Sequence, residues 1–155
     1  MDRPDFAVVR RIIPPGWALI WSGVQSGLTA LAGGRRRFPG QTVLACGLGA
    51  GSLALGIVAL RRFDRAGTTS MPHDPSEATT LVTDGIYAYT RNPMYCSIVL
   101  GLLAHTAWSG RLRTLAAVPG LMLTLRPQIE AEEEALAQLF GDAYADYRAR
   151  VRRWI

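Results

Sequence analysis

Long runs without charge alternate with short basic segments along this chain. Two such runs extend from Ile12 to Gly34 and from Phe38 to Leu60. A third extends from Asn92 to Gly110, and a shorter fourth from Thr114 to Leu125. Since a helix needs about 20 mainly apolar residues to cross a bilayer, the pattern predicts an all-α integral-membrane helical bundle with about four transmembrane helices. The predicted spans are residues 12–34, 38–60, 93–110 and 113–127.

The first and fourth runs each leave a question. The fourth is short, and it spans only if Arg113 and Arg126 extend their side chains towards the headgroups. The first resembles a signal peptide, because Ala30-Leu31-Ala32 precedes Gly33 in an acceptable cleavage pattern. Its core is diluted by Gly, Ser and Gln, and three arginines follow it, which favours a retained span.

The positions of the arginines predict the orientation. The chain has a net charge of +5 and 17 basic residues, all of them arginine. With four spans and the N-terminus inside, twelve arginines fall on the inner side and five in the outer loops. The positive-inside rule then places both termini in the cytoplasm. Arginines that flank apolar runs do not indicate nucleic-acid binding, and the lack of lysine excludes Schiff-base chemistry on a lysine.

The apolar runs contain two cysteines and a glycine-rich segment, which could suggest a metal site and a nucleotide-binding loop; we favour neither. Cys46 and Cys96 lack any metal-ligand spacing, so we expect reduced, buried cysteines and no metal site. The segment GLGAG, residues 47–51, imitates a nucleotide-binding loop, but it lies inside an uncharged run. The spacing of Gly47 and Gly51 instead predicts close helix packing, as does that of Gly23 and Gly27.

A polar loop, residues 63–92, separates the second and third spans. It contains Pro72 and Pro75, which break regular structure, and the turn signal Asp84-Gly85. It ends in Arg91-Asn92-Pro93, where Asn92 can cap the next helix and Pro93 suits its first turn. Capping alone does not explain the nearby Tyr87, Tyr89, Arg91 and Tyr95.

A second polar concentration follows the fourth span, and residues 128–155 should form cytoplasmic or interfacial helices. Arg126 and Glu130 share one helical face, Pro127 predicts a kink, and three further glutamates follow. Gly141 should end this helix. Tyr144, Tyr147, Val151 and Trp154 then form a stripe among arginines, which predicts a basic amphipathic helix on the membrane surface.

Together the segments LVTDGIYAYTRNPMY and IEAEEEALAQLFGDAYADYRARVRRW resemble the isoprenylcysteine carboxyl methyltransferase family and its phospholipid methyltransferase relatives. These are integral-membrane enzymes that use S-adenosylmethionine (SAM). The resemblance extends from about Gly67 to Trp154, and it implies a membrane methyltransferase whose site lies at the cytoplasmic face.

The resemblance also implies roles for individual residues. The cofactor-binding positions fall on Thr79, Thr80, Leu81, Val82, Tyr87, Asn92, Pro93, Met94, Tyr95 and Glu130. Arg126 takes the substrate-side position, and Arg126 and Glu130 together are the candidate catalytic pair. Thr79 and Asn92 stand where the eukaryotic enzymes have histidine. These departures match the short bacterial members of the family, so the resemblance implies a protein of a bacterial inner membrane and argues against a prenylcysteine substrate.

Three functions remain open at this stage. The first is methyl transfer from SAM to a lipophilic carboxylate, amine or thiol, with Arg126 positioning a carboxylate. The second is N-methylation of a phospholipid amine, with Glu132 or Glu133 as the base. The third is a non-catalytic membrane scaffold or small-ligand binder. His105, within the third span, is a functional candidate by position, but we expect it to be packed and hydrogen-bonded.

Overall fold

The computed structural model describes residues 14–31, 34, 37–67 and 79–155. Its elements are α1 (Pro14–Leu31), α2 (Gln41–Ala66), the 3-10 helix η3 (Gly85–Ala88), α3 (Pro93–Ser109), the 3-10 helix η4 (Leu112–Ala116) and α4 (Ala117–Arg150). The described residues contain no strand, so the predicted all-α fold is confirmed for them.

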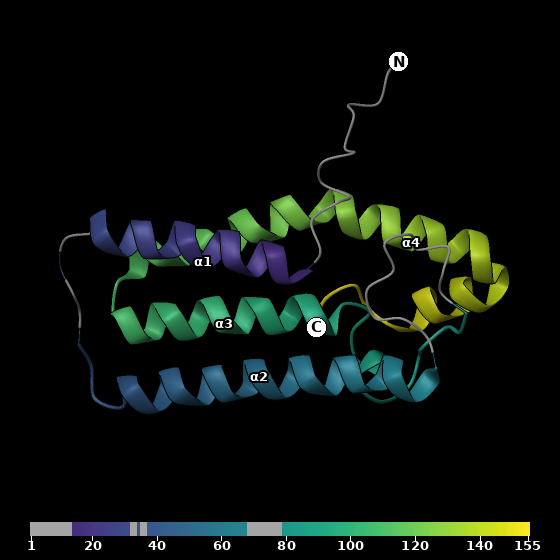
Figure 1. Cartoon of the computed structure of the whole chain (residues 1–155), viewed down its shortest axis with the longest axis horizontal. Coiled ribbons are helices and arrows are strands. Elements are labelled where there is room, and N and C mark those ends of the chain that lie inside the picture. The colour runs from purple at the N-terminus through teal and green to yellow at the C-terminus, as the bar shows by residue number, and fades with distance from the viewer. Residues whose placement is uncertain (1–13, 32–33, 35–36, 68–78) are drawn as a thin grey trace, which may run out of the picture.

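Helices α1, α3 and α2 lie side by side along the long axis of the molecule, with the first half of α4 beside α1 (Figure 1). Residues 79–92 and the second half of α4 lie towards one end, which we call the site end, and the C-terminus lies beside the start of α3 (Figure 1). The last turn of α1, the start of α2 and η4 lie at the opposite end, the far end (Figure 1). The two polar segments of the sequence therefore meet at one end of the bundle.

Within the described residues, one helix, α2, is long and apolar enough to cross a membrane, judged by length and composition. Large apolar side chains are exposed on its neighbours as well, including Leu19 of α1, Trp108 of α3 and Leu123 of α4. Extensive exposed apolar surface is typical of contact with lipid. Four transmembrane helices stay a prediction; residues 12–13 and 32–33 of the first predicted span lie outside the described residues.

The core lies between α1, α3 and α4. Trp17, Leu102 and Leu121 belong to its buried cluster, and α4 adds Leu125 and Ile129. Buried Gln25 of α1 ties the far end together, because its amide donates to the carbonyl oxygen of Leu102 and to the Thr106 hydroxyl, at 2.9 and 3.0 Å. Such bonds satisfy polar groups inside an apolar bundle.

Small residues do bring α2 and α3 together, but they are not the predicted ones. A Cβ added at Gly56 would lie 3.4 Å from the Ser97 hydroxyl, and one at Gly101 would lie 3.2 Å from the Ser52 hydroxyl. A Cβ at Gly47, Gly51, Gly23 or Gly27 would meet nothing within 4 Å. The predicted contact residues are therefore wrong, because a small-xxx-small spacing does not say which face of a helix meets its neighbour.

Helix α4 breaks where the sequence predicts. Gly141 has non-helical angles, φ 49° and ψ −123°, whereas Pro127 stays within the helix. The stripe predicted to lie on the membrane surface instead turns inward, since Tyr144 and Tyr147 are 2% and 4% exposed. Helix α4 ends at Arg150, and Trp154 packs against the core cluster.

Two further predictions concern single residues in the spans. Cys46 is exposed and Cys96 is buried, and both are free, so the expected burial is wrong for Cys46. His105 lies half-buried, with its Nε2 atom 3.4 Å from the Thr29 hydroxyl. That contact confirms the expected packed, hydrogen-bonded histidine.

Candidate functional site

The turn at Asp84-Gly85 sets the course of the loop into the site. Gly85 has a positive φ of 58°, and the Arg62 guanidinium fills the space that a Cβ would need there. Arg62 also pairs with Asp84 at 2.7 Å, which links the turn to the end of α2. The positive φ favours glycine at this position, and a larger residue would also have to displace the Arg62 side chain.

Tyr87 follows on η3 and is buried, with 6% of its surface exposed. Its ring meets Phe63 edge to face at 5.3 Å between centroids. Its backbone carbonyl accepts a hydrogen bond from the Tyr147 hydroxyl at 2.8 Å. Burial raises the pKa of Tyr87 well above its ordinary value, so the residue presents a neutral phenol and an aromatic face.

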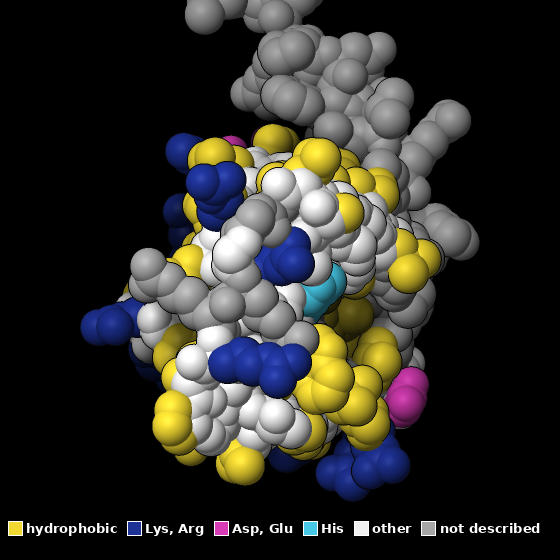
Figure 2. Space-filling view, turned by 90° about the vertical axis from the view of Figure 1, so that its left-hand side faces the viewer, with side chains coloured by type: hydrophobic (Ala, Val, Ile, Leu, Met, Phe, Trp, Pro, Cys, Tyr) yellow, Lys and Arg dark blue, Asp and Glu magenta, His cyan; other side chains and the backbone are white. Residues whose placement is uncertain are grey.

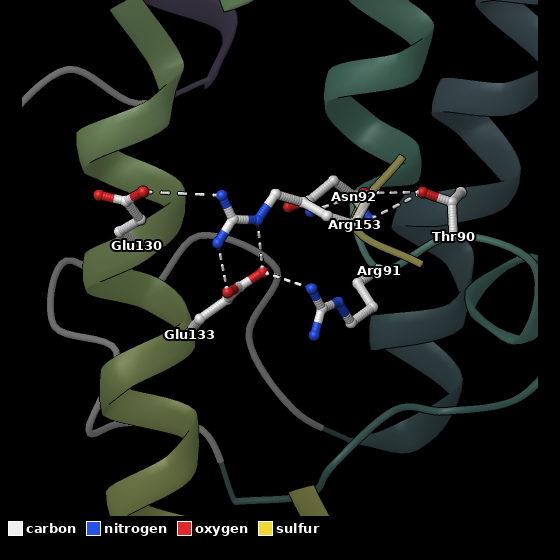
Figure 3. Close-up of polar contacts among 6 residues, drawn as sticks. All are labelled: Thr90, Arg91, Asn92, Glu130, Glu133 and Arg153. Atoms are coloured by element: carbon white, nitrogen blue, oxygen red, sulfur yellow. Dashed lines mark hydrogen bonds and ion pairs between the residues drawn. The ribbon is translucent and has the colours of Figure 1, made fainter. Parts of the chain in front are cut away.

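The residues before α3 hold the C-terminal tail. The carbonyl of Arg153 accepts hydrogen bonds from the Thr90 hydroxyl at 3.1 Å and from the Asn92 amide at 3.0 Å (Figure 3). The backbone N–H of Arg91 donates to the Arg152 carbonyl at 2.9 Å. Asn92 occupies the predicted cap position of α3, but its side chain makes no capping bond. Its amide instead fixes the tail.

Four charged side chains then form what we call the arginine–glutamate cluster: Arg91, Glu130, Glu133 and Arg153. Glu133 pairs with Arg91 at 3.0 Å and with Arg153 at 2.8 Å (Figure 3). Arg153 also reaches Glu130, at 3.7 Å. The side chains of Arg91 and Glu133 are only 10% and 8% exposed, so this is a largely desolvated ion pair.

Arg91 keeps unused hydrogen-bonding capacity inside the cluster. Its Nε and Nη1 atoms are buried and have no hydrogen-bond partner among the described residues. A buried guanidinium with unpaired donors is costly, because these groups have lost water without a replacement. The arrangement suits an acceptor-bearing ligand, such as a carboxylate.

A second set of contacts runs from α1 through α4 to α3. Glu132 accepts a hydrogen bond from the Tyr95 hydroxyl at 2.8 Å and one from the Gln128 amide at 3.1 Å. Gln128 in turn accepts from the Trp17 indole at 2.9 Å. Desolvation raises the pKa of Glu132, an effect that its two hydrogen bonds oppose. A carboxylate with a raised pKa that accepts a hydrogen bond from a buried tyrosine is a candidate functional group.

The predicted pair on α4 forms, but it lies towards solvent. Arg126 and Glu130 meet at 2.9 Å with side chains 68% and 48% exposed. The hydrogen bond from Arg126 lowers the pKa of Glu130 below its ordinary value. Glu130 faces Arg126 on one side and Arg153 on the other, so it is the member of the pair that also joins the cluster.

The other predicted cofactor residues surround this region unevenly. Pro93 begins α3 and is buried, Met94 is half-buried, and Asn92 and Tyr95 are 8% and 3% exposed. Leu81 and Val82 are half-buried, and Thr79 and Thr80 are exposed in the loop. The structure therefore joins Asn92 and Glu130 through Arg153, and Tyr95 to α4 through Glu132.

The ion pairs of Arg91, Glu133 and Arg153 are not predicted from the sequence. Glu133 and Arg153 are 20 positions apart, and the sequence pattern predicts that the arginines of the tail lie beside the membrane. Arg91 was noted only as part of a crowded motif. The acidic run is the signal that predicts such pairing, because four acids beside a membrane exit indicate a cationic partner for at least one of them. Glu133 has two such partners.

Across the described residues, the fold and this site define a helical bundle with exposed apolar side chains, one membrane-capable helix and a polar centre at one end. A family model described as phospholipid methyltransferase matches residues 41–143. The chain belongs to the phospholipid methyltransferase family. The matched segment includes α2, the loop, α3 and the carboxylates of α4.

Individual relatives match shorter segments. An uncharacterized protein of Haemophilus influenzae is 41% identical over 63 residues, 40% of this chain and the whole of that relative. The protein-S-isoprenylcysteine O-methyltransferase of Schizosaccharomyces pombe is 39% identical over 72 residues, 46% of this chain and 30% of the relative. The mouse enzyme of the same name is 33% identical over 86 residues, 50% and 28% of the two chains. The matches thus span under a third of either methyltransferase. No solved structure matches.

Proposed function

We propose that the chain is a SAM-dependent methyltransferase that acts on a lipophilic acceptor at the cytoplasmic face of a membrane. The observation that carries the proposal is the set of buried, unpaired Arg91 donors beside the carboxylates of α4. Family membership supports the reaction class. The relatives' names support a methyl acceptor on oxygen.

The residues of the site fit the chemical groups of SAM. The Arg91 N–H groups can hold its carboxylate. Glu132 and Glu130 can accept hydrogen bonds from its ammonium and ribose hydroxyls, and Tyr87 offers an aromatic face to adenine or the sulfonium. When bound, SAM supplies an activated methyl group. The protein then has to align the acceptor in line and exclude water, which requires no catalytic dyad.

Arg126 is the residue that we assign to the acceptor. Its side chain is exposed at the edge of the site, so it can turn from Glu130 to a carboxylate that arrives from the bilayer. A bidentate pair with the guanidinium would fix the attacking oxygen. We place the acceptor there, and the cofactor on the inner side towards Arg91 and Tyr95.

The alternative acceptor is a phospholipid amine. The raised pKa of Glu132 favours this alternative, because such a carboxylate accepts a proton at neutral pH more readily than an ordinary one. An amine must lose a proton on methylation, and Glu132 is placed to receive it. The two acceptors differ in their products, since a methyl ester is hydrolysed by mild base and an N-methyl group is not.

The first test is calorimetry of SAM binding to detergent-purified protein. We expect micromolar binding by the wild type and at least tenfold weaker binding by Glu130→Ala, because the variant lacks an acceptor for hydrogen bonds from SAM. The variant should still fold, since the carboxylate is exposed. Glu134→Ala is the matched control, since Glu134 is exposed on the same helix. Absence of binding by well-folded wild-type protein would contradict the proposal and favour a scaffold or another ligand.

The second test identifies the acceptor. Protein supplied with methyl-labelled SAM is incubated with lipid carboxylates, thiols and phospholipid amines in vesicles. Base-labile label in the lipid fraction supports carboxyl methylation, and base-stable label on a phospholipid amine supports the alternative. Arg126→Gln should impair the first reaction and leave SAM binding unchanged.

A further inference from the structure

A groove lies between α2, α3 and η4 at the far end, away from the polar site. Its volume is about 600 Å³, within the range of about 300–1,000 Å³ that small-molecule sites occupy. Most of its lining is apolar, with Leu44 and Leu48 from α2, Leu103 from α3, and Leu112 and Leu115 from η4. The groove thus offers a long apolar surface at the outside of the bundle.

One charged residue, Arg37, belongs to the described lining of this groove. Its surroundings contain no compensating acid: the described residues of α1, α3, η4 and the first two-thirds of α2 include no Asp or Glu. Arg111 and Arg113 add positive charge beside η4. In Figure 2, which looks onto this end, arginine side chains stand beside a hydrophobic patch. The far end therefore combines an apolar groove with a basic rim.

We propose that this groove binds one anionic phospholipid of the leaflet at the far end. An acyl chain lies along the leucines, and the phosphate pairs with Arg37. Arginine suits a phosphate because its N–H groups match the oxygens in pairs. The inference rests on the membrane location of the family and does not depend on methyl transfer.

The bound lipid is distinct from the methyl acceptor. Leu103 lies ten residues along α3 from Pro93, which a rise of 1.5 Å per residue converts to about 15 Å from the site end. Thr106 and Ala107 line the groove still further along. A lipid seated there cannot present its headgroup to Glu130 or Arg91, so it acts as a structural ligand of α2, α3 and η4.

Charge complementarity favours a lipid over a second copy of the chain. A symmetric dimer through this face would bring Arg37 and its basic neighbours towards the same residues of the partner. Like charges brought together without acids oppose that association. An anionic headgroup neutralises the same rim.

The test is native mass spectrometry of detergent-purified protein with phosphatidylglycerol and phosphatidylcholine of the same acyl chains. We expect roughly a fivefold preference for phosphatidylglycerol in the wild type, the factor that one arginine near a lipid headgroup supplies. Arg37→Gln should lower the preference to roughly twofold or less. Arg65→Gln, at the other end of α2, should leave it unchanged.

A second variant tests whether the acyl chain lies in the groove. Leu44 is 48% exposed, so Leu44→Trp can fill the groove without entering the core. It should reduce the retention of both lipids at least threefold, while circular dichroism and SAM binding stay as in the wild type. Equal retention of the two lipids, or no effect of Arg37→Gln, would overturn the proposal. So would a dimer that Leu44→Trp dissociates, since a second copy would then occupy the groove.

Discussion

Glu133 is the residue that holds the site end together. It pairs with Arg91 from the loop and with Arg153 from the tail, and it is 7% exposed. Removing the charge of Glu133 leaves the largely buried guanidinium of Arg91 without its acidic partner. Because two segments depend on this one carboxylate, its loss affects both the loop and the tail.

We therefore expect Glu133→Gln to destabilise the protein by about 3–5 kcal/mol. Chemical unfolding in detergent measures the change. Glu134→Gln is the control, because Glu134 is exposed one position away and should change stability by at most about 0.5 kcal/mol. Equal effects of the two substitutions would show that the cluster contributes nothing to stability.

Glu132 makes a separate prediction about pH. Desolvation raises its pKa above the ordinary value of 4.5 in the folded protein, so ionisation costs more in the folded state than in the unfolded chain. Its contribution to stability is therefore fully present below about pH 4.5 and is lost as the pH rises through the folded pKa. Glu132→Gln removes this dependence, since the amide stays neutral.

The measurement is the melting temperature of Glu132→Gln minus that of the wild type, followed from about pH 4 to about pH 8. The difference should increase with pH and level off above the folded pKa. Glu134→Gln should give a difference without such a rise. A flat profile for Glu132→Gln would mean that the carboxylate is as well solvated as an exposed one.

At the residue scale, the sequence predicts that the two polar segments lie together, but it does not predict which residues pair. The motif from Tyr87 to Tyr95 and the acids of α4 do lie at one end, as the two polar concentrations predict. The bonding of Asn92 to Arg153, and of Tyr95 to Glu132, was not predictable. These partners are distant in sequence, and no local periodicity specifies such pairs.

The α2–α3 packing yields a prediction at the scale of an element. Gly101 lies against Ser52, whose hydroxyl donates to the Ser97 carbonyl at 2.7 Å. Gly101→Val should overpack this contact and destabilise the protein by about 1–3 kcal/mol. Gly51→Val is the control, because a Cβ there meets nothing within 4 Å and the change in helix propensity is the same.

Chemical unfolding of the two variants in detergent gives the comparison. A similar loss for both would show that helix propensity, and not packing against α3, decides the effect.

Charge-free runs indicated where the helices lie, since membrane helices need apolar length. The register of their packing was missed, because every side of such a helix is apolar and the sequence does not distinguish the buried one.

For the whole molecule, the C-terminal tail shows the limit of local patterns. The spacing of Tyr144, Tyr147 and Trp154 was correctly seen as a stripe, but its partner is the protein and not the lipid surface. A stripe with arginines around it fits both environments. The choice depends on whether another segment, here the loop before α3, arrives to cover it.

The orientation in the membrane is the prediction that joins all the elements. With the site end in the cytoplasm, the far end must face the opposite side. Single cysteines at exposed Arg113 and exposed Ala149 report on these two ends, in a background without Cys46 and Cys96. A membrane-impermeant maleimide should label Arg113→Cys in intact cells, after permeabilisation of any outer membrane. It should label Ala149→Cys only after the inner membrane is opened.

The reverse labelling pattern would place the arginine–glutamate cluster outside, where cytoplasmic SAM cannot reach it, and would contradict the proposed reaction. Labelling of both positions from the same side would contradict the predicted topology, since the segment between them, α4, would then fail to cross. The predicted pattern follows from the arginine distribution alone, because twelve of the 17 basic residues fall on the site-end side under a four-span topology. The experiment therefore tests together whether α4 crosses the membrane and on which side the site end lies.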